Sequence, residues 1–265
     1  MSNNIPEEMY RIGLMTWSEV RDALKETDII LVPLGSHEQH GPHSAINTDS
    51  HIAWEITRRA AERFIKETGR RVLVAPLLPI GMSVHHMSFP GTITVKPETL
   101  ICYLTDIGAS LAKHGFRKIV IVNAHGGNCH SLASAGRNIK DETGALVCWF
   151  DPWIFDEEVF KEIMESPPGI YGHACEKETS ILMALDGRVV EDKIPMEQEP
   201  PMYPLPQFMA NTSKYRVGWA WNTNEISESG VLGMPSTSSR EKGERLVETQ
   251  INVFVEFLRQ LSEIT

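Results

Sequence analysis

The chain alternates short, continuously apolar runs with longer segments in which apolar residues recur at helical spacing. Residues 29–34 (IILVPL) and 118–123 (KIVIVN) are runs of the first kind, typical of strands buried on both faces of a sheet. Residues 49–68 and 97–114 are segments of the second kind, and a glycine follows each of them, as is common where a helix ends. The alternation predicts βαβ units.

The same pattern continues along the chain. It predicts further strands at residues 72–75, 91–95 and 145–150, and further helices at residues 17–26, 128–143 and 238–261. Because helical crossovers connect strands in parallel, the expected fold class is α/β, with a mostly parallel sheet flanked by helices on both faces. We expect residues 1–265 to form a single domain.

Two helix starts and one irregular segment can also be located. Thr16 with Glu19, and Ser238 with Glu241, have the spacing of a capping box. Residues 189–237 include five prolines between positions 195 and 206, which disfavour both helix and sheet there. We expect this segment to be a long irregular excursion, of the kind that forms an active-site wall or a subunit contact.

Charge and hydropathy exclude several classes of function. The net charge of −10 argues against a nucleic-acid partner, because phosphate binding needs a cationic surface. No apolar run approaches the roughly 20 residues that a membrane span requires, and the first eight residues are polar and acidic, unlike a secretory signal. We therefore expect a cytoplasmic protein that binds neither nucleic acid nor membrane.

The cysteines suggest little chemistry of their own. The chain has four, with no C-x-x-C pair, so neither a disulfide framework nor a thiolate zinc site is indicated. Cys129 opens a predicted helix and Cys175 adjoins His173, which makes a Cys/His nucleophilic hydrolase a formal alternative. That alternative leaves the acidic residues and histidines described next without a role.

Histidines and carboxylates gather after the predicted strands, where open parallel sheets bind their ligands. The three clusters are GSHEQHGPH at 35–43 with Asp49 close behind, NAHGGN at 123–128, and GHACEKET at 172–179. Imidazoles and carboxylates without paired thiolates suit zinc, manganese or a similar divalent ion. Two metals that share a carboxylate need about five ligands, and the clusters supply Glu38, His40, Asp49, His125 and one glutamate of the third cluster.

The other features of these clusters have less specific interpretations. His85, His86 and His130 are interpreted as structural residues or as residues that orient a ligand. Gly126 and Gly127 permit a tight turn, and they would also allow backbone N–H groups to approach a substrate oxyanion.

Four ordered motifs resemble those of the creatininase (creatinine amidohydrolase) family. They are LVPLGSHEQHGPH at 31–43 with Asp49, HMSFPGTI at 86–93, VNAHGGN at 122–128 and HACEKETS at 173–180. The resemblance implies a compact α/β subunit in a homo-oligomer, commonly a hexamer, that acts on a small-molecule substrate. It also implies two divalent metal ions bridged by a hydroxide, with Zn²⁺ expected and Mn²⁺ or Fe²⁺ as alternatives.

The resemblance also implies roles for individual residues. Carried over position by position, Glu38 and His125 hold the first metal, His40 holds the second, and Asp49 bridges both. His173 is then placed to carry a proton to the leaving group, and its alternative role is to orient a ligand.

The chain departs from creatininase itself at the second metal. Creatininase has Tyr and Glu after its motif histidine, and that Glu is a second-metal ligand, whereas this chain has Gly126 and Gly127. Glu178 is the expected replacement, and Glu176, about 200° away around a helix, is expected to point outward or to cap the helix. The same departure removes a residue that contacts creatinine, so creatinine is not the expected substrate.

The expected function is that of a dinuclear metal-dependent hydrolase. Its metal-bridging hydroxide would attack the carbonyl of a small cyclic or formyl amide, breaking a C–N bond. The alternative reaction opens a ring C–C bond of a cyclic polyol ketone of the inosose type. The alternative of another class is a catalytically inactive metal-binding scaffold.

Overall fold

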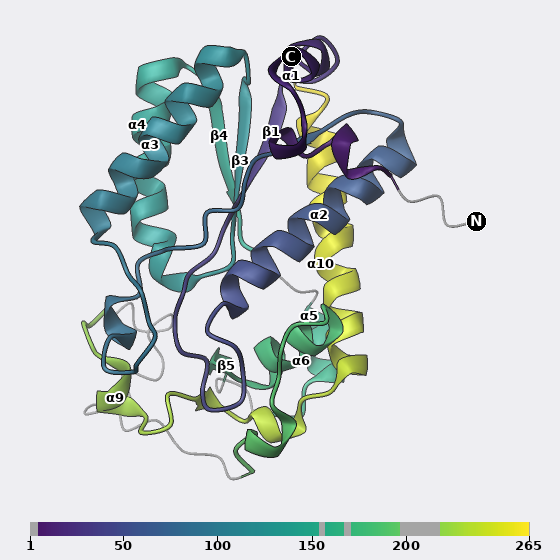
Figure 1. Ribbon diagram of the computed structural model, residues 1–265. Coiled ribbons are helices and arrows are strands. Elements are labelled where there is room, and N and C mark those ends of the chain that lie inside the picture. The colour runs from purple at the N-terminus through teal and green to yellow at the C-terminus, as the bar shows by residue number, and fades with distance from the viewer. Residues whose placement is uncertain (1–4, 154–156, 167–170, 197–217, 265) are drawn as a thin grey trace.

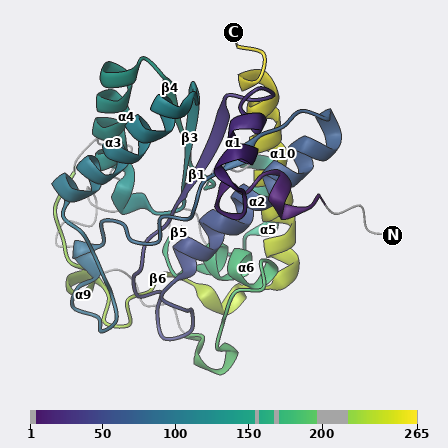
Figure 2. The same cartoon turned by 45° about the horizontal axis from the view of Figure 1, so that its top comes forward.

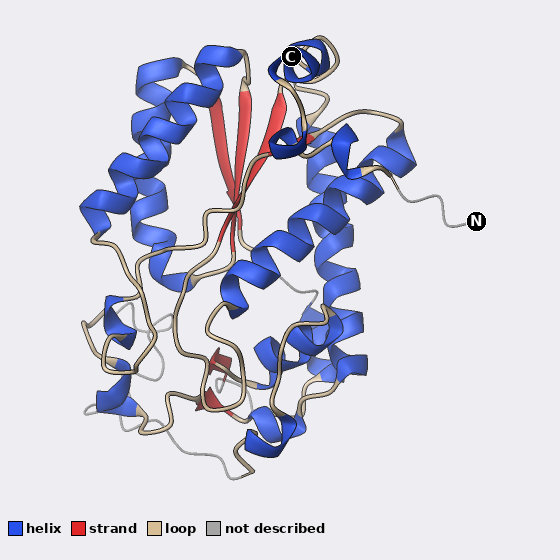
Figure 3. Ribbon diagram, viewed as in Figure 1, coloured by secondary structure: helices blue, strands red, loops and turns tan. Residues whose placement is uncertain are grey.

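A parallel sheet of four strands forms the centre of the protein (Figures 1 and 3). The computed structural model describes residues 5–153, 157–166, 171–196 and 218–264. The strands are β1 (Ile29–Leu34), β2 (Leu73–Val74), β3 (Lys118–Asn123) and β4 (Leu146–Phe150), in the order β2–β1–β3–β4. β1 and β3 pair from Ile29 opposite Lys118 to Leu34 opposite Asn123, so both strands end at the same edge of the sheet.

Helices cover both faces of this sheet, as the rotated view shows (Figure 2). α3 (Pro97–His114) and α4 (Cys129–Thr143) lie on one side, and α2 (Thr48–Thr68) and α10 (Arg240–Leu261) lie on the other. Successive side chains of β1 alternate between the two layers, so Ile30 and Val32 pack toward α3 and α4, whereas Leu31 packs toward α2 and α10. The predicted α/β fold is confirmed.

Of the remaining elements, α1 (Trp17–Ala23) lies near the start of β1, whereas the others lie toward the opposite end of the sheet (Figure 1). These others are α5 (Glu157–Ile163), α6 (Glu176–Ala184), α9 (Thr223–Ile226) and the antiparallel pair β5 (Tyr171–His173) and β6 (Leu232–Gly233). Short 3₁₀ helices span Val84–His86 and Gly126–Asn128. Within the described ranges, no helix is both long enough and apolar enough to cross a membrane.

Several local predictions are confirmed. Thr16 and Glu19 form the expected capping box at the start of α1. α2 and α3 end at Gly69 and Gly115, whose φ angles of 68° and 114° favour glycine. These ends follow from local sequence alone.

Two predictions are wrong. Residues 91–95 form no strand, because only Ile93 makes a bridge, to His37, and no neighbouring strand continues the pairing. The cap of α10 is Ser239, whose hydroxyl accepts the N–H of Lys242 at 3.2 Å. Ser238 instead donates its hydroxyl to the carbonyl oxygen of Glu176 at 3.2 Å, so a contact with α6 overrides the capping box.

The expected irregular excursion is confirmed where it is described. Residues 197–217 lie outside the described residues. The rest of the 189–237 segment holds only short elements, including α9 and β6. Trp219, Trp221 and Leu232 of this segment line a cavity beside the histidine clusters, so these residues form part of its wall.

Candidate metal centre

The five predicted ligands come from three places and meet at the end of the sheet. Glu38, His40 and Asp49 follow β1, His125 follows β3, and Glu178 lies in the first turn of α6. All five are buried. The register of β1 with β3 brings the first two groups together, because both strands end at that edge.

Asp49 lies between the two histidines. Its Oδ1 atom is 3.2 Å from Nε2 of His40, and its Oδ2 atom is 3.2 Å from Nδ1 of His125. Beyond His40, the Oε2 atom of Glu178 is 4.0 Å from Nε2 of that ring. Beyond His125, the Oε2 atom of Glu38 is 3.2 Å from Nε2. The cluster thus has two halves, Glu38 with His125 and His40 with Glu178, and Asp49 presents one oxygen to each half.

Several of these atoms lack hydrogen-bond partners among the described residues. They are Oε1 of Glu38, Nε2 of His40 and Oδ2 of Asp49. Leaving a buried polar atom unsatisfied costs roughly 1–3 kcal/mol, so three such atoms at one point require an explanation. Nitrogen and carboxylate oxygen are the donor atoms that zinc and manganese take, so the donor set fits a divalent metal.

Neighbouring charges set the protonation of the cluster. Burial raises the pKa of the Glu38 carboxyl to about 7. Burial is the largest single effect on His40 and lowers its pKa, but Asp49, Glu178 and Glu38 together outweigh it and raise this pKa to about 10. The charges of Glu38 and Asp49 likewise outweigh burial at His125 and raise its pKa to about 9. The metal-free cluster therefore keeps protons on imidazoles that a metal would displace.

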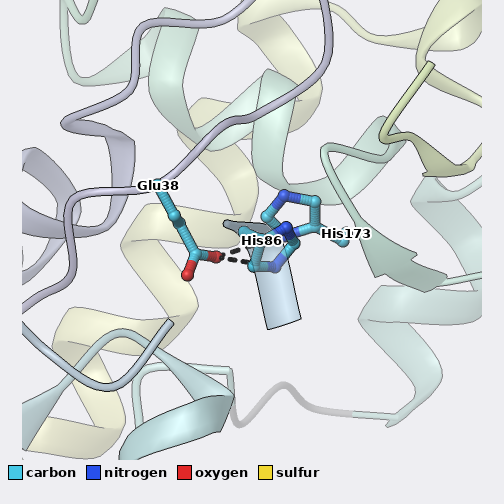
Figure 4. Close-up of side chains that lie close together, drawn as sticks. All are labelled: Glu38, His86 and His173. Carbon is cyan, nitrogen blue, oxygen red and sulfur yellow. Dashed lines mark ion pairs between the residues drawn. The ribbon is translucent and has the colours of Figure 1, made fainter. Parts of the chain in front are cut away.

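His86 belongs to the same cluster, although the sequence suggested no ligand role for it. Its Nε2 atom lies 3.3 Å from Oε1 of Glu38, and Nδ1 of His173 lies 3.6 Å from that oxygen (Figure 4). A donor from each of the three could hold a metal. In the sequence, the only indication was that His86 opens the HMSFPGTI motif. The long loop after β2 brings this residue to the cluster, and local sequence does not reveal that.

The partners of His86 decide which of its nitrogens carries the proton. Its Nδ1 atom accepts from Nε2 of Gln39 at 2.8 Å and from the hydroxyl of Thr223 at 2.9 Å. The Gln39 amide is oriented by donating to the Gly230 carbonyl at 3.1 Å and by accepting from the N–H of Gly41 at 2.8 Å. His86 therefore directs an Nε2–H toward Glu38.

His173 is the last residue of β5, and its ring packs against the rings of two other histidines. The ring centroids of His40 and His86 lie 4.3 Å and 4.4 Å away. Burial and the charge of His40 hold the pKa of His173 well below its usual range. The next residue, Ala174, has the uncommon φ of 50°, and its N–H donates to Oε2 of Glu178, which ties His173 to the start of α6.

The two glutamates of α6 take different directions, as the helical spacing predicts. Glu178 faces His40. Glu176 faces away from the cluster, but the expectation that it points outward is wrong, because its side chain is fully buried. It accepts from the N–H and hydroxyl of Ser166 at 2.8 Å and 2.6 Å and from the ammonium of Lys242 at 2.5 Å. Lys242 is supplied by α10, which local sequence could not indicate.

A cavity of about 730 Å³ opens onto the cluster. Its walls include residues of the metal cluster and three tryptophans, Trp153, Trp219 and Trp221. His85 also lines it and lies edge-on to Trp221, with 5.2 Å between the ring centroids. A small organic molecule would reach the convergent donor atoms through this space.

Gly126 and Gly127 form the tight turn that the sequence predicts, a 3₁₀ helix ahead of α4. A Cβ atom at Gly127 would collide with Nε2 of His125 and with the carbonyl oxygen of Met82. Glycine is therefore needed there to seat His125.

The thiols do not fit a nucleophile. Burial and the nearby Asp151 raise the pKa of Cys129, and burial and Glu178 raise that of Cys175 to about 11. A nucleophilic cysteine requires the opposite shift, because the thiolate is the reactive form. The cysteine alternative is not favoured.

Comparison with known proteins identifies the family of this chain. The creatinine amidohydrolase family model matches residues 13–258, so the chain belongs to the creatininase family. It is an amidohydrolase-type hydrolase. The mycofactocin precursor peptide peptidase of Mycolicibacterium smegmatis is 32% identical over 225 residues, covering 84% of this chain and 81% of the relative. The 3-dehydro-scyllo-inosose hydrolase of Thermotoga maritima is 28% identical over 262 residues, covering 94% and 82%.

Solved structures of creatininase share the fold. One with Mn superposes with a TM-score of 0.81 at 26% identity, and it covers 96% of this chain and 99% of its own. A Zn–Zn type of a creatininase mutant superposes with a TM-score of 0.80 at the same identity, with 96% and 98% covered. These solved structures are of Mn and Zn forms of creatininase, and zinc and manganese are also the metals that the donor atoms of this chain suit.

Proposed function

We propose that the protein is a dinuclear metal-dependent hydrolase that cleaves the C–N bond of a small cyclic or formyl amide. The observation that carries this proposal is the position of Asp49, with one carboxylate oxygen beside His40 and the other beside His125. A bridging carboxylate needs this arrangement, since each metal takes a different oxygen. The other two carboxylates of the cluster lie on opposite sides of Asp49, Glu38 beyond His125 and Glu178 beyond His40.

Each metal has a set of protein ligands in this proposal. Glu38 and His125 hold the first, His40 and Glu178 hold the second, and Asp49 serves both. Two divalent cations, when bound, generate a nucleophile from water near neutral pH and polarise the scissile carbonyl. The five ligands are buried, and the cavity would admit substrate to them.

His173 is the group that moves the proton. Its Nε2–H is held by the Gln39 carbonyl, and its Nδ1 faces the centre without a proton. A neutral imidazole in this orientation accepts a proton at Nδ1 and returns it to the departing amine.

Opening of a ring C–C bond is the second candidate function. It is favoured by the similarity to an inosose hydrolase along 94% of the chain. The same donor atoms and the same histidine would serve it, because the first step is again addition to a carbonyl.

The test joins metal content with turnover. Protein stripped with a chelator is reloaded with Zn²⁺, Mn²⁺ or Fe²⁺, its bound metal is measured by elemental analysis, and it is assayed on cyclic amides, formamides, short peptides and inosose-type ketones. We expect about two ions per chain and turnover of an amide. Turnover of ketones alone would favour the second candidate, and full metal loading without any turnover would favour the inactive scaffold.

A matched pair of variants tests the bridging role. Asp49→Asn removes the charge shared by both halves and is expected to lower the affinity for both ions. Asp106→Asn changes an exposed aspartate on α3 and is expected to change neither metal content nor activity. Unaltered loading of Asp49→Asn would overturn the dinuclear assignment.

A further inference from the structure

One cation lies among the residues around the substrate cavity. Of the described residues that line it, Lys177 is the only lysine or arginine. It immediately precedes Glu178 on α6, and its charge lowers the pKa of that carboxyl, which burial raises overall. Lys177 and Glu178 both line the cavity, so the lysine borders the second half of the metal cluster.

Trp153 determines where this ammonium sits. The Nζ atom of Lys177 is 4.7 Å from the centroid of the Trp153 ring, a cation–π contact. The ring is itself anchored, since its Nε1–H donates to the carbonyl of Ala124 at 3.2 Å and its backbone N–H donates to Asp151 at 3.0 Å. Ala124 directly precedes His125. The hydrogen bond from Trp153 therefore fixes the tryptophan, and with it the lysine, relative to the metal cluster.

Asp151 lies near Lys177 but is not among the described residues that line the cavity. Burial raises the pKa of Asp151, and the nearby charge of Lys177 opposes this shift in part. Its carboxylate also accepts the backbone N–H of Trp153. Asp151 thus supports the base of the tryptophan, whereas the lysine and the ring belong to the cavity wall.

The charge of the loaded site favours an anion. Glu38, Asp49 and Glu178 supply three negative charges and a metal-bound hydroxide would supply a fourth, which together do not balance the five positive charges of two divalent cations and the ammonium of Lys177. A substrate with a carboxylate would gain a charge-assisted hydrogen bond from the ammonium. Its apolar part would meet the indoles of Trp153, Trp219 and Trp221.

We propose that Lys177, held against Trp153, is a carboxylate-binding subsite, and that the substrate is an amide that also carries a carboxylate and an apolar or aromatic group. This inference rests on the proposed hydrolase function, because it uses the metal-loaded charge of the site. It adds a specificity determinant that lies outside the ligand set.

The experiment measures binding rather than turnover. The probes are N-methanesulfonylphenylalanine and N-methanesulfonylphenylalaninol. The first has a carboxylate where the second has a hydroxymethyl group, and neither contains an amide carbonyl to hydrolyse. Their dissociation constants are measured by calorimetry with metal-loaded wild type, Lys177→Met, Lys177→Arg and Lys113→Met. Lys113 is an exposed lysine on α3, so its variant controls for the loss of one surface charge.

We expect the acid to bind more tightly than the alcohol in wild type, partly through the metals and partly through Lys177. Lys177→Met should reduce this preference by about tenfold, which corresponds to 1.4 kcal/mol. Lys177→Arg should retain most of it, and Lys113→Met all of it. Equal preferences in wild type and Lys177→Met, with equal metal content, would overturn the subsite.

The result separates the two proposals. A preference that depends on Lys177, in a protein that hydrolyses no amide, would keep the subsite and refute the hydrolase function. Hydrolysis of amides with no dependence on Lys177 would keep the function and refute the subsite.

Discussion

The Nε2 atom of His173 lies 2.6 Å from the carbonyl oxygen of Gln39. Because a carbonyl only accepts, Nε2 carries the proton and Nδ1 presents its lone pair toward Glu38, 3.6 Å away. Gln39 separates Glu38 from His40 in the chain, so the segment that supplies two of the proposed metal ligands also sets the tautomer of His173, the proposed proton carrier.

His173→Gln is expected to reduce kcat by about 10²–10⁴-fold, because it removes a general acid and base. The bound metal should stay unchanged, since His173 is assigned to neither ligand set. The measurement is steady-state kinetics beside elemental analysis of the same sample. Loss of one ion together with activity would instead make His173 a metal ligand.

Glu178→Gln is expected to reduce bound metal from about two ions per chain toward one and to remove most activity, because a carboxylate ligand is lost. Glu176→Gln is the matched control from the same helix turn. It should retain both ions, because Glu176 is bound to Lys242 and Ser166, away from the cluster. The reverse result would exchange the roles of the two glutamates.

Glu176 is expected to contribute to stability in a pH-dependent way. Despite its burial, hydrogen bonds from Lys242, Ser166 and the backbone of Glu165 keep the pKa of this carboxyl below its usual value. Because this pKa is lower in the folded state, the ionised carboxylate stabilises the folded protein at pH values above the unfolded pKa of about 4.3. This stabilisation is lost as the pH falls through the folded-state pKa.

At pH 7, Glu176→Gln should lower the free energy of unfolding by about 2 kcal/mol, typical for a hydrogen-bonded charge. The difference from wild type should shrink as the pH is lowered below about 4. Urea unfolding of both proteins across this range is the measurement, with the exposed Glu256→Gln on α10 as control. A difference that does not change with pH would rule out the charge as its source.

His86→Ala is expected to weaken metal binding without removing an ion. Its Nε2 atom lies 3.3 Å from Oε1 of Glu38, so we expect His86 to orient this proposed ligand, and losing such a partner typically costs 10–100-fold in metal affinity. Competition with a fluorescent chelator measures this affinity. Thr223→Val, which removes one donor to Nδ1 of His86, should show the same effect in weaker form. Loss of a whole ion from His86→Ala would show that the ring binds metal itself.

Local physics was enough to predict most of the architecture. The continuous apolar runs of β1 and β3 indicate strands covered on both faces, and glycines such as Gly69 end helices through their own backbone freedom. The same strands predicted where Glu38 and His125 would meet, because parallel strands end at one edge.

Longer-range relationships required the tertiary structure. The loop after β2 brings His86 beside Glu38, and α10 brings Lys242 to Glu176 across 66 positions of sequence. Ser238 lost its capping role to a contact with α6 for the same reason. The sequence by itself determined the elements, the sheet edge and the chemical type of the ligands, since these depend on neighbours a few residues apart. Tertiary packing decided which tautomers, buried ion pairs and cavity walls surround them, because those partners are remote in the chain.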